Sequence, residues 1–210
     1  MYGIQNFELF CISAIVLSVT PGPDTFYILG RTISQGSNSG IASVLGISTG
    51  VLVHTIAAAI GLSTILATSA LIFRIIKFIG AAYLVYLGIT LILASKDTGV
   101  LNRNNLSSSG FWKIYRQGVI TNVLNPKVAL FFLSFLPQFI DPDHGGVISF
   151  VFLGIIYVFT CTAWYLIFAV FSSAMARTFQ KNPLLIRTMN KISGGIFIGL
   201  GLSLAFSETD

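Results

Sequence analysis

The chain has 210 residues, of which 54% are hydrophobic and only 9% are charged, and its mean hydropathy is +0.86. These values exclude a soluble domain of this size and indicate a membrane protein that crosses the bilayer several times. The formal net charge of +5 does not point to nucleic acid as a partner, because the cations lie between apolar segments and form no basic cluster.

Six apolar segments reach the length of a membrane span, since about 20 apolar residues cross a bilayer as a helix. They comprise residues 7–30, 40–66, 70–94, 119–140, 147–172 and 190–207. The sequence therefore predicts an all-α integral membrane protein with six transmembrane helices. The first segment carries Glu8 where a signal peptide would carry Lys or Arg, so we interpret it as a retained span.

The first apolar segment is interrupted by Pro21, Gly22 and Pro23, which are followed directly by Asp24. Proline removes a backbone donor and opens the helix, and polar backbone is tolerated at membrane depth only inside protein or beside a cavity. A charge at this depth costs at least about 2.5 kcal/mol on insertion scales, so Asp24 is a candidate functional residue. We predict a protonatable coupling site or an anchor for an amine, with an N-cap for the helix after the break as the structural alternative.

In the second segment Gly46, Gly50 and His54 recur every four residues and so share one helix face. Small residues at this spacing permit close helix packing. His54 could relay protons, because imidazole titrates near neutral pH, or it could be a neutral histidine bonded to a neighbouring helix. Gly80 in the third segment is a further predicted packing residue.

A polar stretch over residues 95–110, rich in Asn and Ser, separates the third apolar segment from the fourth. Directly after it, residues 111–116 mix aromatic and cationic side chains, as in a short helix at the level of the lipid headgroups, with a simple loop as the alternative. We therefore divide the chain into a first three-helix repeat (1–94), a cytoplasmic linker with an interfacial helix (95–118) and a second three-helix repeat (119–210).

The fourth segment contains a second break at Pro126, which is followed by Lys127. An ammonium inside a helix bundle needs a carboxylate partner, which could be Asp24 or the carboxylate of a bound amino acid. Asn122 and Asn125 lie on one side of this helix and could bind a substrate or satisfy freed backbone groups. As an alternative, Lys127 could extend along the helix toward the cytoplasmic surface.

Lysine and arginine concentrate on one side of the predicted membrane. That side holds Arg31, Lys96, Arg103, Lys113, Arg116, Arg177, Lys181, Arg187 and Lys191, whereas the other side holds Arg74 and Lys77. The positive-inside rule places the first group in the cytoplasm. The acidic loop at 141–143 and the acidic tail at 208–210 then lie outside, and both termini are predicted to lie outside.

The two halves of the chain resemble each other as weak repeats. A shift of 103 residues places Pro23-Asp24 on Pro126-Lys127. Because each half has three spans, the second copy would enter the membrane upside down relative to the first. In many transporters with this arrangement, the discontinuous helices of the two halves meet near the membrane midplane. We therefore predict two inverted three-helix repeats that bring Asp24 and Lys127 close together, with chance similarity between apolar segments as the alternative.

The sequence contains no Walker A loop, HEXXH helix, GxSxG elbow or cluster of metal ligands. We therefore expect no enzyme, no primary pump, no cofactor and no bound metal, and transport would draw its energy from a gradient. Cys11 and Cys161 lie far apart in apolar segments, which is typical of buried small hydrophobic residues rather than of a redox pair.

These motifs together resemble the lysine exporter superfamily, most closely the RhtB-type homoserine and threonine exporters of bacterial inner membranes. The resemblance covers nearly the whole chain. It rests on Thr20-Pro21-Gly22-Pro23 in the first segment, Gly46-x-x-x-Gly50 with His54 in the second, Lys77-x-x-Gly80-Ala81-Ala82-Tyr83-Leu84 in the third, and Asn125-Pro126-Lys127 running on to Leu136-Pro137-Gln138-Phe139 in the fourth.

The resemblance implies a six-span exporter of amino acids or close derivatives, driven by the proton-motive force, in the bacterial cytoplasmic membrane. Its substrates would be homoserine, threonine, homoserine lactone or other neutral or basic amino acids, and no residue here selects among them. The expected partners are this substrate, protons and the lipid bilayer, with a homo-oligomer left open. On this hypothesis the substrate ammonium binds near Asp24 and its carboxylate near Lys127.

Two other functions stay open at the level of the sequence. A transmembrane thiol–disulfide electron carrier would use paired cysteines beside membrane prolines, but neither Cys11 nor Cys161 adjoins a proline. A metal-ion exporter would need several carboxylates or thiols within its spans, and Asp24 is the only carboxylate in the interior of a span.

Overall fold

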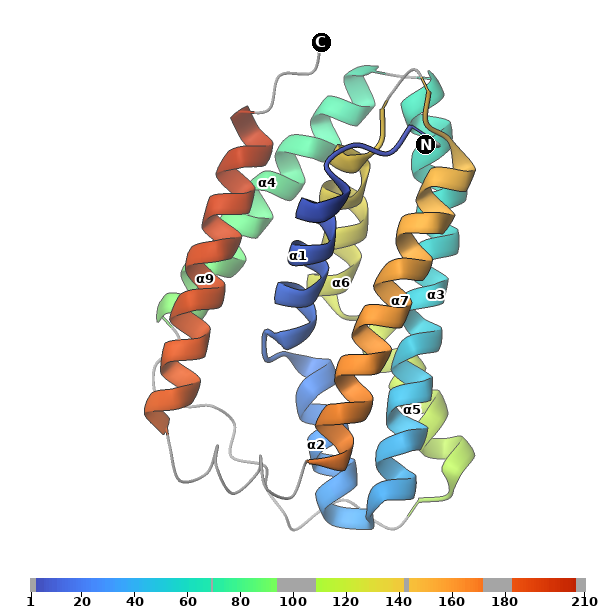
Figure 1. Ribbon diagram of the computed structural model, residues 1–210, viewed down its shortest axis with the longest axis vertical. Coiled ribbons are helices and arrows are strands. Elements are labelled where there is room, and N and C mark those ends of the chain that lie inside the picture. The colour runs from blue at the N-terminus through green and yellow to red at the C-terminus, as the bar shows by residue number, and fades with distance from the viewer. Residues whose placement is uncertain (1–2, 69, 94–108, 142–143, 172–182, 207–210) are drawn as a thin grey trace.

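The computed structural model describes residues 3–68, 70–93, 109–141, 144–171 and 183–206, and within these ranges the regular elements are helices, beside one isolated bridge between Ile4 and Ile140. The elements, drawn in Figure 1, are α1 (Phe7–Val19), α2 (Pro23–Gln35), α3 (Ser37–Thr68), α4 (Ala70–Leu93), α5 (Phe111–Val123), α6 (Pro126–Leu130), the π-helical turn η1 (Phe131–Phe135), the 3₁₀ turn η2 (Leu136–Phe139), α7 (Val147–Val170) and α9 (Pro183–Phe206).

Two of the predicted spans are broken at their prolines. The axes of α1 and α2 meet at an angle of 48°, and α5 meets the α6–η2 segment at the same angle. Pro23 and Pro126 each occupy the first turn of the new helix, where the missing N–H would have no partner within the helix in any case. The same property prevents a proline from continuing the preceding helix, so each break falls at its proline.

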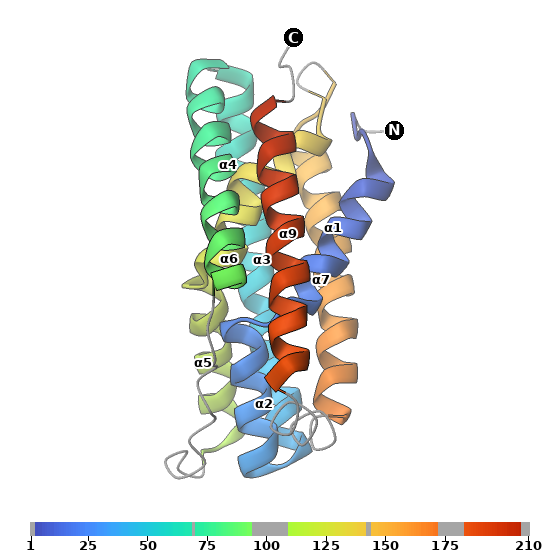
Figure 2. The same cartoon turned by 90° about the vertical axis from the view of Figure 1, so that its left-hand side faces the viewer.

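The two bent pairs run in opposite directions through one helical bundle. In Figure 1, α1 begins and α9 ends at the upper end of the bundle, whereas α2 ends and α3 and α5 begin at its lower end. Figure 2 shows the same elongated arrangement from the side, with α5 below α6 and α2 below α1. Contacts along their length join α3 to both α5 and α7, and join α4 to α9.

Two single helices are long and apolar enough to cross a membrane, namely the Ser37–Ile65 part of α3 and the whole of α7. The number of candidate spans rises to four if each bent pair forms one span. The helices α4 and α9 have 24 residues each, and α4 contains a shorter apolar stretch, Phe78–Thr90. Six spans in two inverted repeats thus remain a prediction for this all-helical membrane protein.

The middle of the chain differs in one detail from the sequence-based picture. Residues 111–116 form the first turns of α5, which continues without interruption to Val123. Most of the expected linker, including Lys96 and Arg103, lies outside the described residues, as do Arg177, Lys181, Asp143 and the tail at 207–210. The proposed division into two repeats and a linker therefore stays a prediction.

Three of the predicted packing glycines lie at helix contacts. A Cβ atom on Gly46 would collide with the carbonyl oxygen of Tyr115 in α5, and one on Gly80 would collide with the side chain of Ser134 in η1. A Cβ atom on Gly50 would lie 2.7 Å from the Cβ atom of Asn122, too close for two carbon atoms. The bare backbone at Gly50 therefore leaves the space that the Asn122 side chain occupies.

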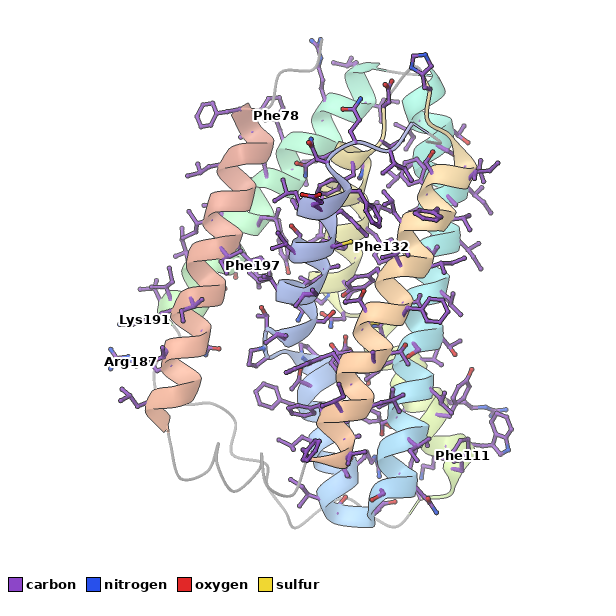
Figure 3. The ribbon with its side chains drawn as sticks, in the orientation of Figure 1. Phe78, Phe111, Phe132, Arg187, Lys191 and Phe197 are labelled. Atoms are coloured by element: carbon purple, nitrogen blue, oxygen red, sulfur yellow. The ribbon has the colours of Figure 1, made fainter. Side chains whose placement is uncertain are left out.

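The contact between α4 and α9 depends on two glycines that face each other. A Cβ atom on Gly88 would lie 2.5 Å from the carbonyl oxygen of Gly194, and a Cβ atom on Gly194 would lie 2.5 Å from that of Gly88. Figure 3 shows Arg187 and Lys191 projecting from α9 away from the bundle. Phe197, on the same helix, is buried. Backbone-to-backbone packing thus joins a helix of the first half to one of the second.

We expect Gly194→Ala to lower the free energy of unfolding by about 1–3 kcal/mol, the usual cost of overpacking, because the new methyl group meets a rigid backbone carbonyl. The matched control is Gly195→Ala, since a Cβ atom on Gly195 meets nothing within 4 Å. That variant should gain roughly 0.5–1 kcal/mol from the better helix propensity of alanine. Reversible unfolding in mixed detergent micelles measures both values, and equal stabilities would contradict this account of the contact.

Candidate functional site

The Lys127 side chain connects the two helix breaks. Its ammonium donates hydrogen bonds to the carbonyl oxygens of Leu17, at 3.0 Å, and Thr20, at 2.9 Å, at the end of α1. These carbonyls have no amide partner further along their helix and carry the negative end of its dipole, so a buried cation is well placed there. Only 6% of Lys127 is exposed, and the side chain does not extend toward a surface as the alternative prediction had it.

Gly22 makes room for this ammonium. A Cβ atom at Gly22 would lie 3.2 Å from Nζ of Lys127, which is tighter than ordinary van der Waals contact. Gly22 also occupies the N-cap position of α2, without a side-chain cap, so Asp24 does not serve as that N-cap. The position of Gly22 between two prolines therefore combines a turn in the backbone with a space for the Lys127 side chain.

Asp24 lies in the first turn of α2, at the positive end of that helix, and is 1% exposed. Its Oδ2 atom accepts a hydrogen bond of 2.9 Å from Nδ2 of Asn122 in α5. Asp24 and Lys127 interact electrostatically, but no ion pair with an N–O distance of 4.0 Å or less joins them. Each charge thus has its own helix terminus, and the two charges are near each other without being salt-bridged.

The two asparagines hold the backbone around the second break. Asn125 caps α6, because its Oδ1 atom accepts a hydrogen bond of 3.1 Å from the backbone N–H of Lys127. The backbone carbonyl of Asn122 lies 3.2 Å from Nε2 of His54 in α3. Asn122 and Asn125 are 0% and 1% exposed. Sequence-based reasoning placed these residues together, and the structure gives each of them a defined hydrogen-bonding role.

Several buried polar atoms at the breaks have no hydrogen-bond partner among the described residues. They are Oδ1 of Asp24, Oδ1 of Asn122 and Nδ2 of Asn125. An ammonium has three donors, so Lys127 also keeps one N–H beyond the two carbonyls it binds. Buried polar groups in proteins are normally paired. The Asn125 side chain also lies within reach of the Asp24 carboxylate. The cluster therefore offers acceptors on Asp24 and Asn122 and donors on Lys127 and Asn125, a set that suits a small ligand with one cationic and one anionic group.

His54 borders this cluster on one side and a pocket on the other. The pocket has a volume of about 250 Å³ and lies between α3 and the α6–η1 segment. It is lined by His54, Ala57, Ala58, Gly61, Leu62, Ile65, Ala129, Phe132 and Leu133. The imidazole stacks on the ring of Phe132, with 5.8 Å between ring centroids, and Figure 3 shows Phe132 in the middle of the bundle. His54 therefore separates an apolar opening from the buried Asp24–Asn122 pair.

Aromatic side chains close the bundle above the cluster. Phe10 of α1 packs against Phe131 and Phe139, with ring centroids 6.3 and 5.4 Å apart, and Phe131 packs on Tyr157 of α7 at 5.1 Å. All four rings are at most 2% exposed. At the upper end, the backbone of residues 3–5 is hydrogen-bonded to that of residues 139–141. Sequence-based reasoning could not single out this group, because aromatic residues occur in every apolar segment.

Hydrogen bonds between α2 and α5 close the bundle below the cluster. The hydroxyl group of Tyr27 donates to the backbone carbonyl of Ile114 at 2.7 Å, and Nη2 of Arg31 donates to Oε1 of Gln117 at 2.6 Å. Arg31 was expected in the first cytoplasmic loop, yet it lies within α2 and is buried. Its spacing of seven residues from Asp24, which places both on one helix face, is the signal that could have identified it.

The remaining sulfur and acidic groups form no second site in the described residues. Cys11 and Cys161 are free thiols, and no three or more His, Cys, Asp or Glu side chains there are grouped as metal ligands.

Comparison with known proteins agrees with the resemblance drawn from the sequence. Residues 15–208 match the LysE type translocator family. The chain is 32% identical over 201 residues to the uncharacterized membrane protein YrhP of Bacillus subtilis strain 168, covering 92% of this chain and 95% of that protein. It is 28% identical over 216 residues to the leucine efflux protein of Salmonella choleraesuis strain SC-B67, covering 97% and 96%. No solved structure matches.

The family match extends over both helix breaks and the helices that carry His54, Asn122 and Lys127, so it includes every residue of the buried polar cluster. The chain therefore belongs to the LysE type translocator family of membrane transporters.

Proposed function

We propose that this protein exports amino acids or close derivatives across the bacterial cytoplasmic membrane, driven by the proton-motive force. The observation that carries the proposal is the buried cluster at the two helix breaks, with acceptors on Asp24 and Asn122 and donors on Lys127 and Asn125. An amino acid at neutral pH presents an ammonium and a carboxylate a few bonds apart. These two groups match the two halves of the cluster.

In the proposed complex the substrate ammonium binds Oδ1 of Asp24 and Oδ1 of Asn122, and the substrate carboxylate binds Nζ of Lys127 and Nδ2 of Asn125. Hydrogen bonds that involve a charged group contribute about 1.5–3 kcal/mol each. The efflux activity named for the Salmonella relative supports amino acids as the substrate class. Homoserine, threonine, homoserine lactone and other neutral or basic amino acids all remain candidates.

The proposed topology has six spans, formed by the two bent pairs, α3, α4, α7 and α9. A 24-residue helix is about 36 Å long, enough to cross the hydrocarbon core of a bilayer. We place the lower end in the cytoplasm because the positive-inside rule applies to the loops there. Both termini then lie outside, and the two broken helices form corresponding parts of two inverted repeats.

Proton coupling is proposed to act at Asp24. Its free carboxylate oxygen can bind either a proton or the substrate ammonium, so the two compete for one position. A proton that arrives from outside would displace the substrate outward, and its release inward would reset the empty site. His54 lies between the apolar pocket and the carbonyl of Asn122, where it could pass protons toward Asp24.

The Asp24→Asn variant should no longer bind a proton at this position. A pH gradient should therefore no longer stimulate its transport. The asparagine can still accept the hydrogen bond from Asn122, so the fold should survive. The measurement is counterflow of labelled amino acids in proteoliposomes with and without an imposed pH gradient. Glu8→Gln, which removes an exposed carboxylate, is the matched control. Gradient-stimulated flux in the Asp24→Asn protein would refute the coupling role.

Lys127→Gln should reduce the preference for a free carboxylate in the substrate. We expect the wild-type protein to favour an amino acid over its uncharged amide by about tenfold or more, the equivalent of one charged hydrogen bond. The Lys127→Gln variant should lower this acid-to-amide preference at least severalfold. Lys113→Gln, at an exposed lysine, should leave the preference unchanged. Competition of acid and amide for counterflow gives the ratio. An unchanged ratio in Lys127→Gln would argue that the carboxylate binds elsewhere.

His54→Gln should slow gradient-driven export more than it slows substrate exchange without a gradient. Glutamine can keep the contact with the carbonyl of Asn122 but cannot carry a proton at neutral pH. Initial rates in the two modes, compared in the same proteoliposomes, measure the effect. Equal slowing of both modes would mean that His54 has only a structural role.

A further inference from the structure

Arg31 is a buried cation that the proposed transport mechanism does not yet use. It lies in the lower part of α2 and is 5% exposed. One guanidinium nitrogen, Nη2, donates to Oε1 of Gln117, and the guanidinium carbon lies 5.8 Å from the centre of the Tyr27 ring. The other two nitrogens, Nε and Nη1, are buried and have no hydrogen-bond partner in the described part of the chain.

The surroundings of this guanidinium are uncharged. Gln117 and Tyr27 are neutral, and no carboxylate within 4.0 Å of the group is found among the described residues. An arginine side chain stays protonated at all physiological pH values. A buried charge is normally paired, because the cost of removing it from water is otherwise not offset. The site therefore has a positive charge with no charged partner among the described residues. The Tyr27 side chain lies beside the guanidinium, and N–H groups on Nε, Nη1 and Nη2 remain beyond the bond to Gln117.

A planar fork of N–H donors is the arrangement that binds a carboxylate with two parallel hydrogen bonds. Arg31 and Asp24 are seven residues apart on one face of α2, about 10.5 Å along the helix axis. Arg31 is nearer than Asp24 to the lower end of α2. A substrate that passes along this face from the lower end would therefore meet Arg31 first and the buried cluster second.

We infer that Arg31 forms a second, cytoplasmic-side binding site for the carboxylate of the substrate, separate from the site at Lys127. This inference rests on the proposed export of amino acids. The carboxylate accepts one hydrogen bond from Nη1 or Nε and one from the second N–H of Nη2, while the first N–H of Nη2 stays on Gln117 and fixes the plane of the guanidinium. The bond between Arg31 and Gln117 also joins α2 to α5 below the cluster.

Gln117→Glu is the sharpest test, because it changes the charge next to Arg31 with almost no change in shape. The new carboxylate would pair with the guanidinium and compete with the substrate. We expect KM for amino-acid uptake into inside-out vesicles to rise about tenfold or more, with a smaller change in kcat. Arg31→Gln should raise the same KM by a similar factor. Arg116→Gln, at an exposed arginine of α5, is the control for lost positive charge.

A purely structural role for Arg31 predicts a different pattern. A bond that only ties α2 to α5 would be kept or strengthened by Gln117→Glu, so transport would stay unchanged and the inference would be wrong. KM measured from the other side, with right-side-out vesicles, should change less than twofold in all three variants. Wild-type protein that transports no amino acid would refute the proposed function instead, so the two failures are distinguishable.

A lipid phosphate is another anion that the same fork could bind. The measurement is therefore repeated in proteoliposomes made only of zwitterionic lipids and in others with added anionic lipid. A KM effect of Arg31→Gln that is equal in both supports the substrate carboxylate as the ligand. An effect that occurs only with anionic lipid would assign the site to a headgroup and overturn the inference.

Discussion

The pairing of the Lys127 ammonium with the last carbonyl groups of α1 is the interaction on which the rest of the structure depends. The breaks at the prolines leave backbone groups at both junctions without partners in a helix. Inside an apolar bundle these groups need other hydrogen-bond partners. Lys127 supplies one partner from the opposite half of the chain, and Asn125 supplies another within its own half. Without these bonds the carbonyl groups of Leu17 and Thr20 and the N–H group of Lys127 would lose their side-chain partners, at a cost of about 1–3 kcal/mol for each buried group.

This arrangement also explains why two opposite charges lie close together without neutralising each other. A direct salt bridge between Asp24 and Lys127 would leave no charged group for a ligand. The dipoles of two helix ends stabilise the two charges separately, the cation at the end of α1 and the anion at the beginning of α2. The carboxylate therefore keeps an oxygen, and the ammonium keeps a proton, beyond the hydrogen bonds described above.

The sequence predicted the positions of the breaks and the membership of the cluster, because proline and a charge inside an apolar segment have strong local consequences. The resemblance to the lysine exporter superfamily is also confirmed by the family match. The partner of Lys127 could not be predicted, since hydrogen bonds to backbone carbonyls have no sequence signature. Arg31 was misplaced because counting cations by loop treats an arginine near a helix end as a surface residue. In fact, α2 continues to Gln35, five residues beyond the predicted end of the span.

The facing glycines of α4 and α9 have a consequence for biosynthesis. Gly88 is translated about a hundred residues before Gly194, which lies in the last of the described helices. On the proposed topology the glycine face of α4 is therefore inserted before its partner, and it is held by its contacts with α3, and with η1 once that segment has followed. The synthesis of α9 then covers this face. A ribosome that stalls before α9 would leave an incomplete bundle, marked by an exposed strip of helix backbone for membrane quality control to recognise.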